Sequence, residues 1–327
     1  MATFVKTSQQ EATIASFSNL KGREYRGHKS SVHTVGWSCD GRKLASGSVD
    51  KTARIWAPER LYDSRSSNSF ELRGHSESVD QLCWDPTHPD HLATASGDKT
   101  VRIWDARSAK SIHTIATNGQ NINISWSPDG HHIAVGNKED LITFIDTKTF
   151  KVEKTYVSRV EVNEISWDPT GKLFCLTTGQ GSIKVMDFAT MKEIVALPAH
   201  TANCYCLEFS PSGKYLASGS ADALVNLWDL ESYACVRTFG GLDWPIRTIS
   251  FSHDGEFLAS ASEDLAIEVS LVETGETVHR IECYAAMNTV AWHPSKYLLA
   301  YAGEEQDPRP GGGSISKGNI RVWGYAT

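Results

Sequence analysis

An aromatic residue followed by a polar turn recurs at nearly constant spacing along the whole chain. The anchor residues are Trp37, Trp84, Trp126, Trp167, Phe209, Phe251 and Trp292, with intervals of 47, 42, 41, 42, 42 and 41 residues. A fixed period of about 20–50 residues is typical of solenoids, propellers and repeat arrays. Seven repeats of this length account for most of the 327 residues. We therefore expect one repeat domain over residues 23–327, preceded by a short N-terminal extension over residues 1–22.

Each repeat has the texture of antiparallel sheet. After Phe209 come the turn residues Pro211-Ser212-Gly213, a strand-like run, a second turn at Ala221-Asp222 and a second run that ends in Trp228-Asp229. Short strand-like runs bounded by turn residues predict antiparallel strands. No segment shows a sustained 3.6-residue apolar period. The expected fold class is all-β.

Two dipeptides mark the ends of several repeats. Gly27-His28, Gly74-His75 and the near match Ala199-His200 stand early in their repeats, whereas Trp104-Asp105 and Trp228-Asp229 stand late. This pattern resembles the WD repeat, in which each copy forms a four-stranded blade. The resemblance implies a seven-bladed WD-repeat β-propeller. The last copy lacks a fourth strand, so the N-terminal residues 23–26 are expected to close the ring as the outer strand of the last blade.

A set of His, Ser or Thr, Asp and Trp recurs in three blades. The three sets are His28, Ser46, Asp50 and Trp56; His75, Thr94, Asp98 and Trp104; and His200, Ser218, Asp222 and Trp228. A His, a hydroxyl and an Asp invite a catalytic-triad interpretation, but an active site occurs once and this set recurs. The WD-repeat resemblance implies a structural hydrogen-bonded relay. Blades three, four and six lack parts of the set and are expected to rely on apolar packing.

Composition excludes several function classes. The formal net charge is −7 and the pI is about 5.9, which argues against a strongly basic nucleic-acid module. No apolar run reaches the length that spans a bilayer. The seven scattered cysteines favour reduced thiols, and Cys204 and Cys206 lack the second pair that a zinc site needs. With no catalytic or cofactor-binding motif, we expect no enzyme, no metal and no cofactor.

The candidate partner-binding surface is the rim of the central channel. Six of its residues stand four positions before an anchor, where the innermost strand of a blade begins. The seventh, Trp244, stands where blade six departs from the Gly-His pattern. The predicted rim residues are His33, Asp80, Asn163, Tyr205, Trp244, Arg247 and Asn288. This rim lacks the Arg/Lys cluster of a phosphopeptide reader and the basic funnel of an RNA channel.

Trp244 replaces the Gly-His start of blade six, within Gly240–Pro245. It is either an interface anchor, a role in which Trp is enriched, or a filler of the gap left by the missing His. A second departure is the segment 303–318, whose Gly, Pro and charged residues predict a mobile loop.

Several phrases narrow the family. SGDKTVRIWD (96–105), GQNINISWSPDG (119–130), LDWPIRTISFSHDG (242–255) and LASASEDLAIEV (258–269) resemble the WD-repeat subunits of the THO complex, the core of the transcription–export (TREX) complex. The resemblance implies a nuclear, non-catalytic scaffold that couples transcription to mRNA packaging, processing and export through protein–protein contacts. Implied partners are other THO subunits, especially a large helical one, and indirectly the TREX helicase and export adaptor. RNA contact is expected mainly through the assembled complex, and no membrane contact is expected.

An alternative comes from Trp104-Asp105-Ala106-Arg107. This tetrapeptide fits the W-D-x-R box of propellers that act as substrate receptors of cullin-type ubiquitin ligases. The same tetrapeptide is also a common ending of a blade strand, so the two interpretations remain open at this point.

Overall fold

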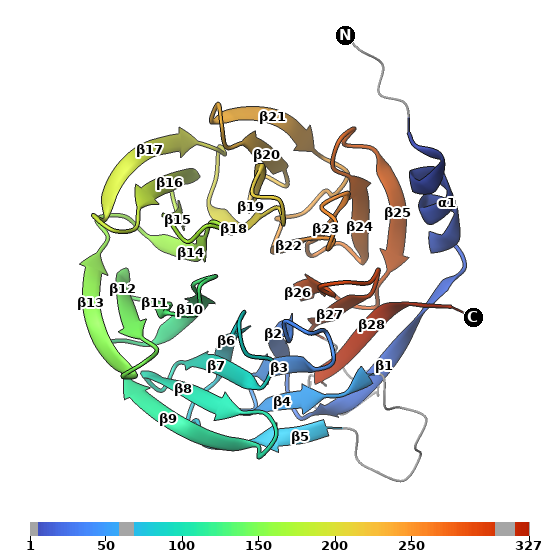
Figure 1. Ribbon diagram of the computed structural model, residues 1–327. Helices are drawn as coiled ribbons and strands as arrows, with labels where there is room; N and C mark the ends of the chain where they lie inside the picture. Colours follow the sequence, from blue (N-terminus) through green and yellow to red (C-terminus); the bar gives the residue numbers. More distant parts are fainter. Residues whose placement is uncertain (1–5, 59–68, 305–317, 327) are drawn as a thin grey trace, which may run out of the picture.

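The computed structural model describes residues 6–58, 69–304 and 318–326. They form a ring of seven four-stranded antiparallel sheets around a central channel (Figure 1). This confirms the predicted all-β, seven-bladed propeller. Most of the predicted mobile loop at 303–318 lies outside the described residues. Within them, no helix has both the length and the apolar character needed to cross a bilayer.

Six blades follow the chain in order from the inner to the outer strand. Blade one comprises β2 (Val32–Trp37), β3 (Leu44–Ser48), β4 (Ala53–Trp56) and β5 (Ser69–Leu72), and blade two β6 (Val79–Trp84), β7 (His91–Ser96), β8 (Thr100–Asp105) and β9 (Lys110–Ala116). Blade three comprises β10 (Asn121–Trp126), β11 (His132–Asn137), β12 (Leu141–Asp146) and β13 (Lys151–Val157). Blade four comprises β14 (Val162–Trp167), β15 (Leu173–Thr178), β16 (Ser182–Asp187) and β17 (Lys192–Pro198). Blade five comprises β18 (Cys204–Phe209), β19 (Tyr215–Ser220), β20 (Val225–Asp229) and β21 (Ala234–Phe239), and blade six β22 (Thr248–Phe251), β23 (Phe257–Ala261), β24 (Ala266–Leu271) and β25 (Thr277–Glu282).

Blade seven joins both ends of the chain. Its strands β26 (Met287–Trp292), β27 (Leu299–Gly303) and β28 (Gly318–Ala326) are completed on the outside by β1 (Leu20–His28). β1 pairs antiparallel with β28, from Leu20 opposite Ala326 to His28 opposite Gly318. The N-terminal residues therefore close the ring as predicted. The strand begins at Leu20, three residues before the predicted start of the propeller at residue 23, so it includes the last residues of the predicted N-terminal extension.

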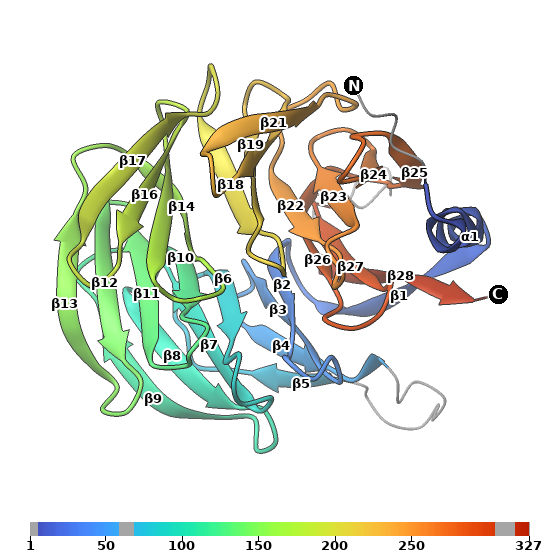
Figure 2. The same cartoon turned by 45° about the horizontal axis from the view of Figure 1, so that its top comes forward.

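A helix that the sequence did not predict precedes the closing strand. α1 (Ser8–Phe17) lies outside the ring beside β25 and β1 (Figure 2). Thr7 and Gln10 form a capping box at its start, which satisfies N–H groups that the first turn leaves unpaired. Phe17 is buried, with its ring centroid 5.1 Å from that of Phe257 and 5.4 Å from that of Trp323. The helix is thus anchored across blades six and seven.

The core lies between successive blades. Second strands such as β3 are buried along their whole length because neighbouring blades cover both faces, whereas outer strands such as β17 are mostly exposed. The turns between first and second strands use the predicted glycines. Gly213, for example, has φ +71°, a conformation that costs glycine little and other residues more.

Side chains of one blade pair with the free inner edge of the next. The Val35 amide donates to Thr289 Oγ1 at 3.1 Å, and the Ile124 amide donates to Gln81 Oε1 at 2.5 Å. These amides belong to inner strands that face the channel without a further strand, so they need other acceptors. These hydrogen bonds join neighbouring blades and also pair amide groups on the inner edge strands.

Candidate functional site

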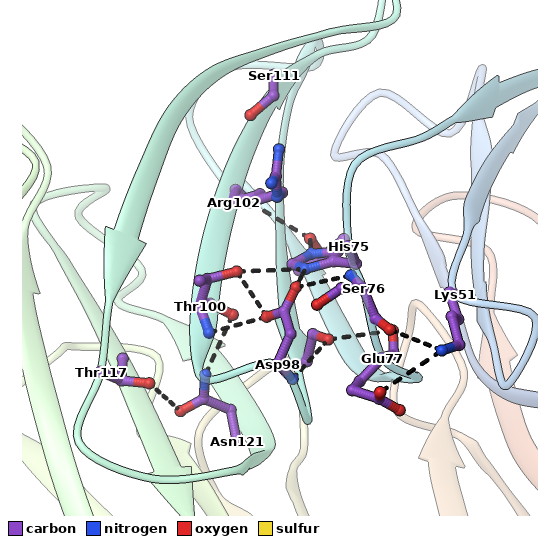
Figure 3. Close-up of polar contacts among 12 residues, drawn as sticks. Lys51, His75, Ser76, Glu77, Asp98, Thr100, Arg102, Ser111, Thr117 and Asn121 are labelled. Atoms are coloured by element: carbon purple, nitrogen blue, oxygen red, sulfur yellow. Dashed lines mark hydrogen bonds and ion pairs between the residues drawn. The ribbon is translucent and has the colours of Figure 1, made fainter.

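The relay of blade two shows how one predicted set is arranged, and Figure 3 shows its His75 and Asp98 together with Ser76 and Thr100. His75 Nδ1 lies 2.8 Å from Asp98 Oδ2, and His75 Nε2 lies 2.8 Å from Thr94 Oγ1. The Trp104 indole N–H donates to the same hydroxyl at 2.9 Å. A carboxylate only accepts hydrogen bonds, so Nδ1 carries the imidazole proton and Nε2 accepts from the hydroxyl. The chain therefore runs Trp104 to Thr94 to His75 to Asp98.

The same chain recurs in blades one and five. His28 lies 2.9 Å from Asp50 and 2.7 Å from Ser46, which accepts from Trp56 at 2.9 Å. His200 lies 3.2 Å from Asp222 and 2.8 Å from Ser218, which accepts from Trp228 at 3.2 Å. All three hydroxyl residues have 0% exposure. A substrate has no access to such a hydroxyl, and this geometry favours the structural role over the catalytic one.

The relay aspartates also hold the loop that enters each blade. Asp50 Oδ2 accepts from the Lys29 amide at 2.8 Å, and Asp98 Oδ2 accepts from the Ser76 amide at 3.0 Å. Burial acts to raise the pKa of Asp98, but hydrogen bonds from Thr100 and His75 outweigh it and lower that pKa. Burial lowers the pKa of His75. The pair is therefore a carboxylate facing a neutral imidazole near neutral pH.

Blades three and six, which lack the full set, keep other polar groups at the entering loop, which the expected reliance on apolar packing did not include. In blade three, Asn137 Oδ1 accepts from the amides of Glu139 and Leu141, both at 3.0 Å. In blade six, Asp264 Oδ2 accepts from the amides of Asp243 at 3.0 Å and Trp244 at 3.1 Å. The loop-holding aspartate is thus retained in blade six where the histidine is lost.

Truncation of a relay histidine tests the structural role. His200→Ala leaves Ser218 and Asp222 short of a partner in a buried site, which costs about 1–3 kcal/mol. We expect a lower midpoint in a urea titration followed by tryptophan fluorescence. His131→Ala, in the exposed turn between β10 and β11, serves as the control. A His200→Ala protein as stable as the control would contradict the relay.

Four of the predicted rim residues are used within the ring. His33 Nδ1 lies 3.2 Å from Asp80 Oδ1, which links blades one and two. The Asn163 amide nitrogen donates to the Cys204 carbonyl at 3.0 Å, and that of Asn288 donates to the Val32 carbonyl at 3.3 Å. These hydrogen bonds serve blade-to-blade contact.

The other three rim residues gather on blades five and six. The Arg247 guanidinium lies over the Tyr205 ring at 5.2 Å and pairs with Glu263 at 2.5 Å. Tyr205, Arg247 and Asn288 line a hollow of about 630 Å³ at this side of the rim. Trp244 is 56% exposed, so it does not fill the gap left by the missing histidine.

Two kinds of residue were missed from the sequence. Leu265 and Tyr284 are exposed apolar side chains in loops of blades six and seven, and single apolar loop residues give no periodic signal. Glu164 and Glu208 line the central channel, and their signal was a carboxylate in the middle of an inner strand. No group of three or more potential metal-ligating side chains comes together within residues 6–58, 69–304 and 318–326.

Comparison with known proteins gives matches over most of this chain. The family model described as the THOC3 beta-propeller domain matches residues 28–302. THO complex subunit 3 of Arabidopsis thaliana is 51% identical over 315 residues, which cover 96% of this chain and 99% of that protein. WD repeat-containing protein AAC3 of Dictyostelium discoideum is 37% identical, over 94% of this chain and 68% of that protein. Striatin of Rattus norvegicus is 26% identical, over 86% of this chain and 34% of that protein.

Proposed function

The chain belongs to the THOC3 beta-propeller family, and from this we propose that it is a non-catalytic scaffold subunit of a THO complex. The observation that carries the proposal is the match to THO complex subunit 3 across almost the whole of both chains. In this role the ring couples transcription to mRNA packaging, processing and export in the nucleus. It acts by holding other THO subunits, above all a large helical one, and it reaches the helicase and export adaptor through them.

The physical properties of the ring support a scaffold. The relay hydroxyls, which are the residues most like catalytic nucleophiles, are buried. Blade-to-blade hydrogen bonds such as Val35 to Thr289 join the first and last blades. A closed ring of this kind presents loops in fixed positions, which suits a platform for protein contacts. No cofactor or metal is needed for that role.

The ubiquitin-ligase alternative gains no support. Arg107 of the W-D-x-R box pairs with Asp105 at 2.8 Å, and the Arg107 amide donates to the same carboxylate at 2.8 Å. These bonds form the local turn after β8, which accounts for the tetrapeptide without a partner.

Affinity purification from nuclear extract tests the assignment. The tagged full-length chain is recovered after nuclease treatment, and co-purifying proteins are identified by mass spectrometry. We expect THO subunits in near-stoichiometric amounts. A Trp104→Ala variant, which loses a relay indole, is the control for dependence on the folded ring. Recovery of a cullin adaptor in place of THO subunits would contradict the proposal.

The isolated chain is expected to bind RNA weakly. The single arginine of the rim is neutralised by Glu263, and the net charge is −7. Backbone affinity grows with the number of phosphates that cations neutralise. We expect dissociation constants weaker than about 1 μM near 150 mM salt, measured by fluorescence anisotropy with a labelled oligonucleotide. Nanomolar, sequence-selective binding would instead make the chain itself an RNA reader.

A further inference from the structure

Three large apolar side chains are exposed on loops of blade six and its junction with blade seven. Trp244 is 56% exposed, Leu265 57% and Tyr284 84%. Trp244 lies between β21 and β22, Leu265 between β23 and β24, and Tyr284 between β25 and β26. Because successive strands of a blade run antiparallel, these loops all lie at the same end of the blades. We refer to the three residues as the apolar trio.

Backbone hydrogen bonds hold the loops of the trio side by side. The Trp244 amide donates to Asp264 Oδ2 at 3.1 Å, and Leu265 directly follows that aspartate. The Cys283 amide donates to the Leu265 carbonyl at 2.9 Å, and Tyr284 directly follows that cysteine. The three loops therefore form one connected surface rather than three separate tips. Large exposed apolar side chains on a connected surface mark interaction sites.

The trio adjoins the hollow at the channel rim. Glu263, which precedes Asp264 in the chain, lines the hollow of about 630 Å³. Ala286 and Glu304 line it as well, and the Glu304 amide donates to the Ala286 carbonyl at 3.2 Å. The trio supplies apolar contacts on the outside, and the hollow supplies a concave space toward the channel. Together they form a concave surface flanked by apolar side chains.

Carboxylates dominate the charge of this surface. Asp243, Glu282 and Glu304 are exposed, and none has an ion-pair partner within the part of the chain that the structure describes. The neighbouring cations are committed. Arg247 pairs with Glu263, and Arg280 pairs with the buried Glu268 at 3.3 Å.

Arg321 lies over the Tyr284 ring at 5.1 Å and pairs with Glu24 at 3.4 Å. Like Arg247 and Arg280, it is therefore engaged within the chain. The surface is left with apolar anchors surrounded by uncompensated negative charge.

We propose that the apolar trio and the adjoining hollow bind a basic segment of a THO subunit, with a large apolar side chain flanked by Lys or Arg. The inference rests on the proposed function and adds the docking face and the chemistry of the partner. Apolar anchors carry the affinity, and the carboxylates give charge complementarity that selects and steers a basic partner. RNA does not fit the same surface, because its phosphates would lie against Asp243, Glu282 and Glu304.

Titration against the assembled partner tests the docking face. A THO assembly from the same organism is prepared without this chain. The full-length chain carries a fluorescent label, and its binding to the assembly is measured by titration. Loss of hot-spot aromatics typically costs tenfold or more in affinity. We expect at least about a tenfold loss for the double variant Trp244→Ala with Tyr284→Ala, and a weaker salt dependence for Glu282→Lys with Glu304→Lys.

Matched controls lie on other parts of the ring. Phe70→Ala removes an aromatic residue that is 58% exposed on the outer strand of blade one, and Glu231→Lys reverses an exposed charge in the turn between β20 and β21. Both are expected to bind within twofold of wild type. Circular dichroism melts check that every variant is folded. If the trio variant binds within twofold of wild type, the docking face is wrong although the scaffold role stands. If wild type does not bind at all, the scaffold role fails and the inference with it.

Crosslinking tests the chemistry of the occupant. A photoreactive benzoylphenylalanine replaces Tyr284 in the full-length chain bound to the THO assembly, and the crosslinked peptide is identified by mass spectrometry. We expect a THO-subunit segment with net positive charge and at least one large apolar residue. Crosslinks to RNA, to an acidic segment, to a second copy of this chain or to its own residues 305–317 would each overturn the proposal.

Discussion

Removal of residues 1–28 is expected to abolish cooperative folding of the ring. β1 contributes the whole outer strand of blade seven, and its loss leaves the edge of β28 unpaired. The same deletion removes Tyr25, which is 5% exposed and packs at 6.1 Å from Trp56, and the relay residue His28. Loss of one buried aromatic costs about 3–5 kcal/mol, and whole domains are stable by only about 5–15 kcal/mol. The combined loss therefore reaches the size of the total stability.

Thermal melting by circular dichroism measures this effect. A deletion of residues 1–19 is the control, because it removes α1 and Phe17 but retains β1. We expect the control to melt cooperatively at a lower temperature, and the longer deletion to show no cooperative transition. A synthetic peptide of residues 18–30, added in trans, should restore the transition by pairing with β28. A cooperative melt of the longer deletion close to that of the control would show that the strand does not hold the ring closed.

The ring was predictable because its determinants are local and repeated. Each anchor such as Trp37 or Trp167 ends an inner strand, so the spacing of anchors counts the blades. The closing strand was predictable because the last repeat contains only three strand-like segments and needs a fourth strand from elsewhere in the chain. Its exact start was not, because pairing with Ala326 and Tyr325 extends β1 beyond the residues that resemble a blade.

The helix α1 was missed because its signal is weak. Phe17 is the buried residue of the helix, and Ile14 is partly buried against the same core cluster, which gives no apolar period. The available signal was the capping box of Thr7 and Gln10. Tertiary contact with Phe257 and Trp323 holds the helix in place, and such contacts cannot be read from the local sequence.

The candidate surface was predictable only in part. Trp244 was identified because it breaks the Gly-His pattern of blade six, and the structure exposes it. Leu265 and Tyr284 join it through loop hydrogen bonds that depend on the folded blades. Rim residues such as Asn163 were predicted by position, but their use in blade-to-blade bonds depends on the carbonyl that the ring brings near.

The two glutamates that line the channel, Glu164 and Glu208, are expected to make stability fall as pH rises. Glu164 accepts from Gln81 at 2.9 Å, and Glu208 accepts from the Phe251 amide at 3.2 Å. No cation lies within ion-pair distance of either carboxyl in the described chain. Burial raises the pKa of Glu164 to about 7 and that of Glu208 to about 8, against an ordinary value of 4.5, although the hydrogen bonds act in the opposite direction.

The sign follows from proton binding. A raised pKa means that the folded chain holds these protons more tightly than the unfolded chain does. The contribution is fully present below about pH 4.5 and is lost as pH rises to about 7 for Glu164 and about 8 for Glu208. The rise in the pKa of Glu208 from 4.5 to about 8 would by itself be worth about 5 kcal/mol, at about 1.4 kcal/mol for each tenfold change in proton affinity. Glu208 is partly exposed to channel water, which screens the charge, so about 2 kcal/mol is a better expectation.

Replacement of Glu208 with Gln tests this expectation. Gln keeps the size and the acceptor oxygen for the Phe251 amide but carries no charge. We expect Glu208→Gln to be more stable than wild type by about 2 kcal/mol at pH 9, and to lose most of that advantage at pH 5. Urea titrations of wild type and variant at both pH values measure the difference. Glu231→Gln in an exposed turn is the control and should shift neither value. An advantage of equal size at both pH values would mean that Glu208 acts through packing rather than through its charge.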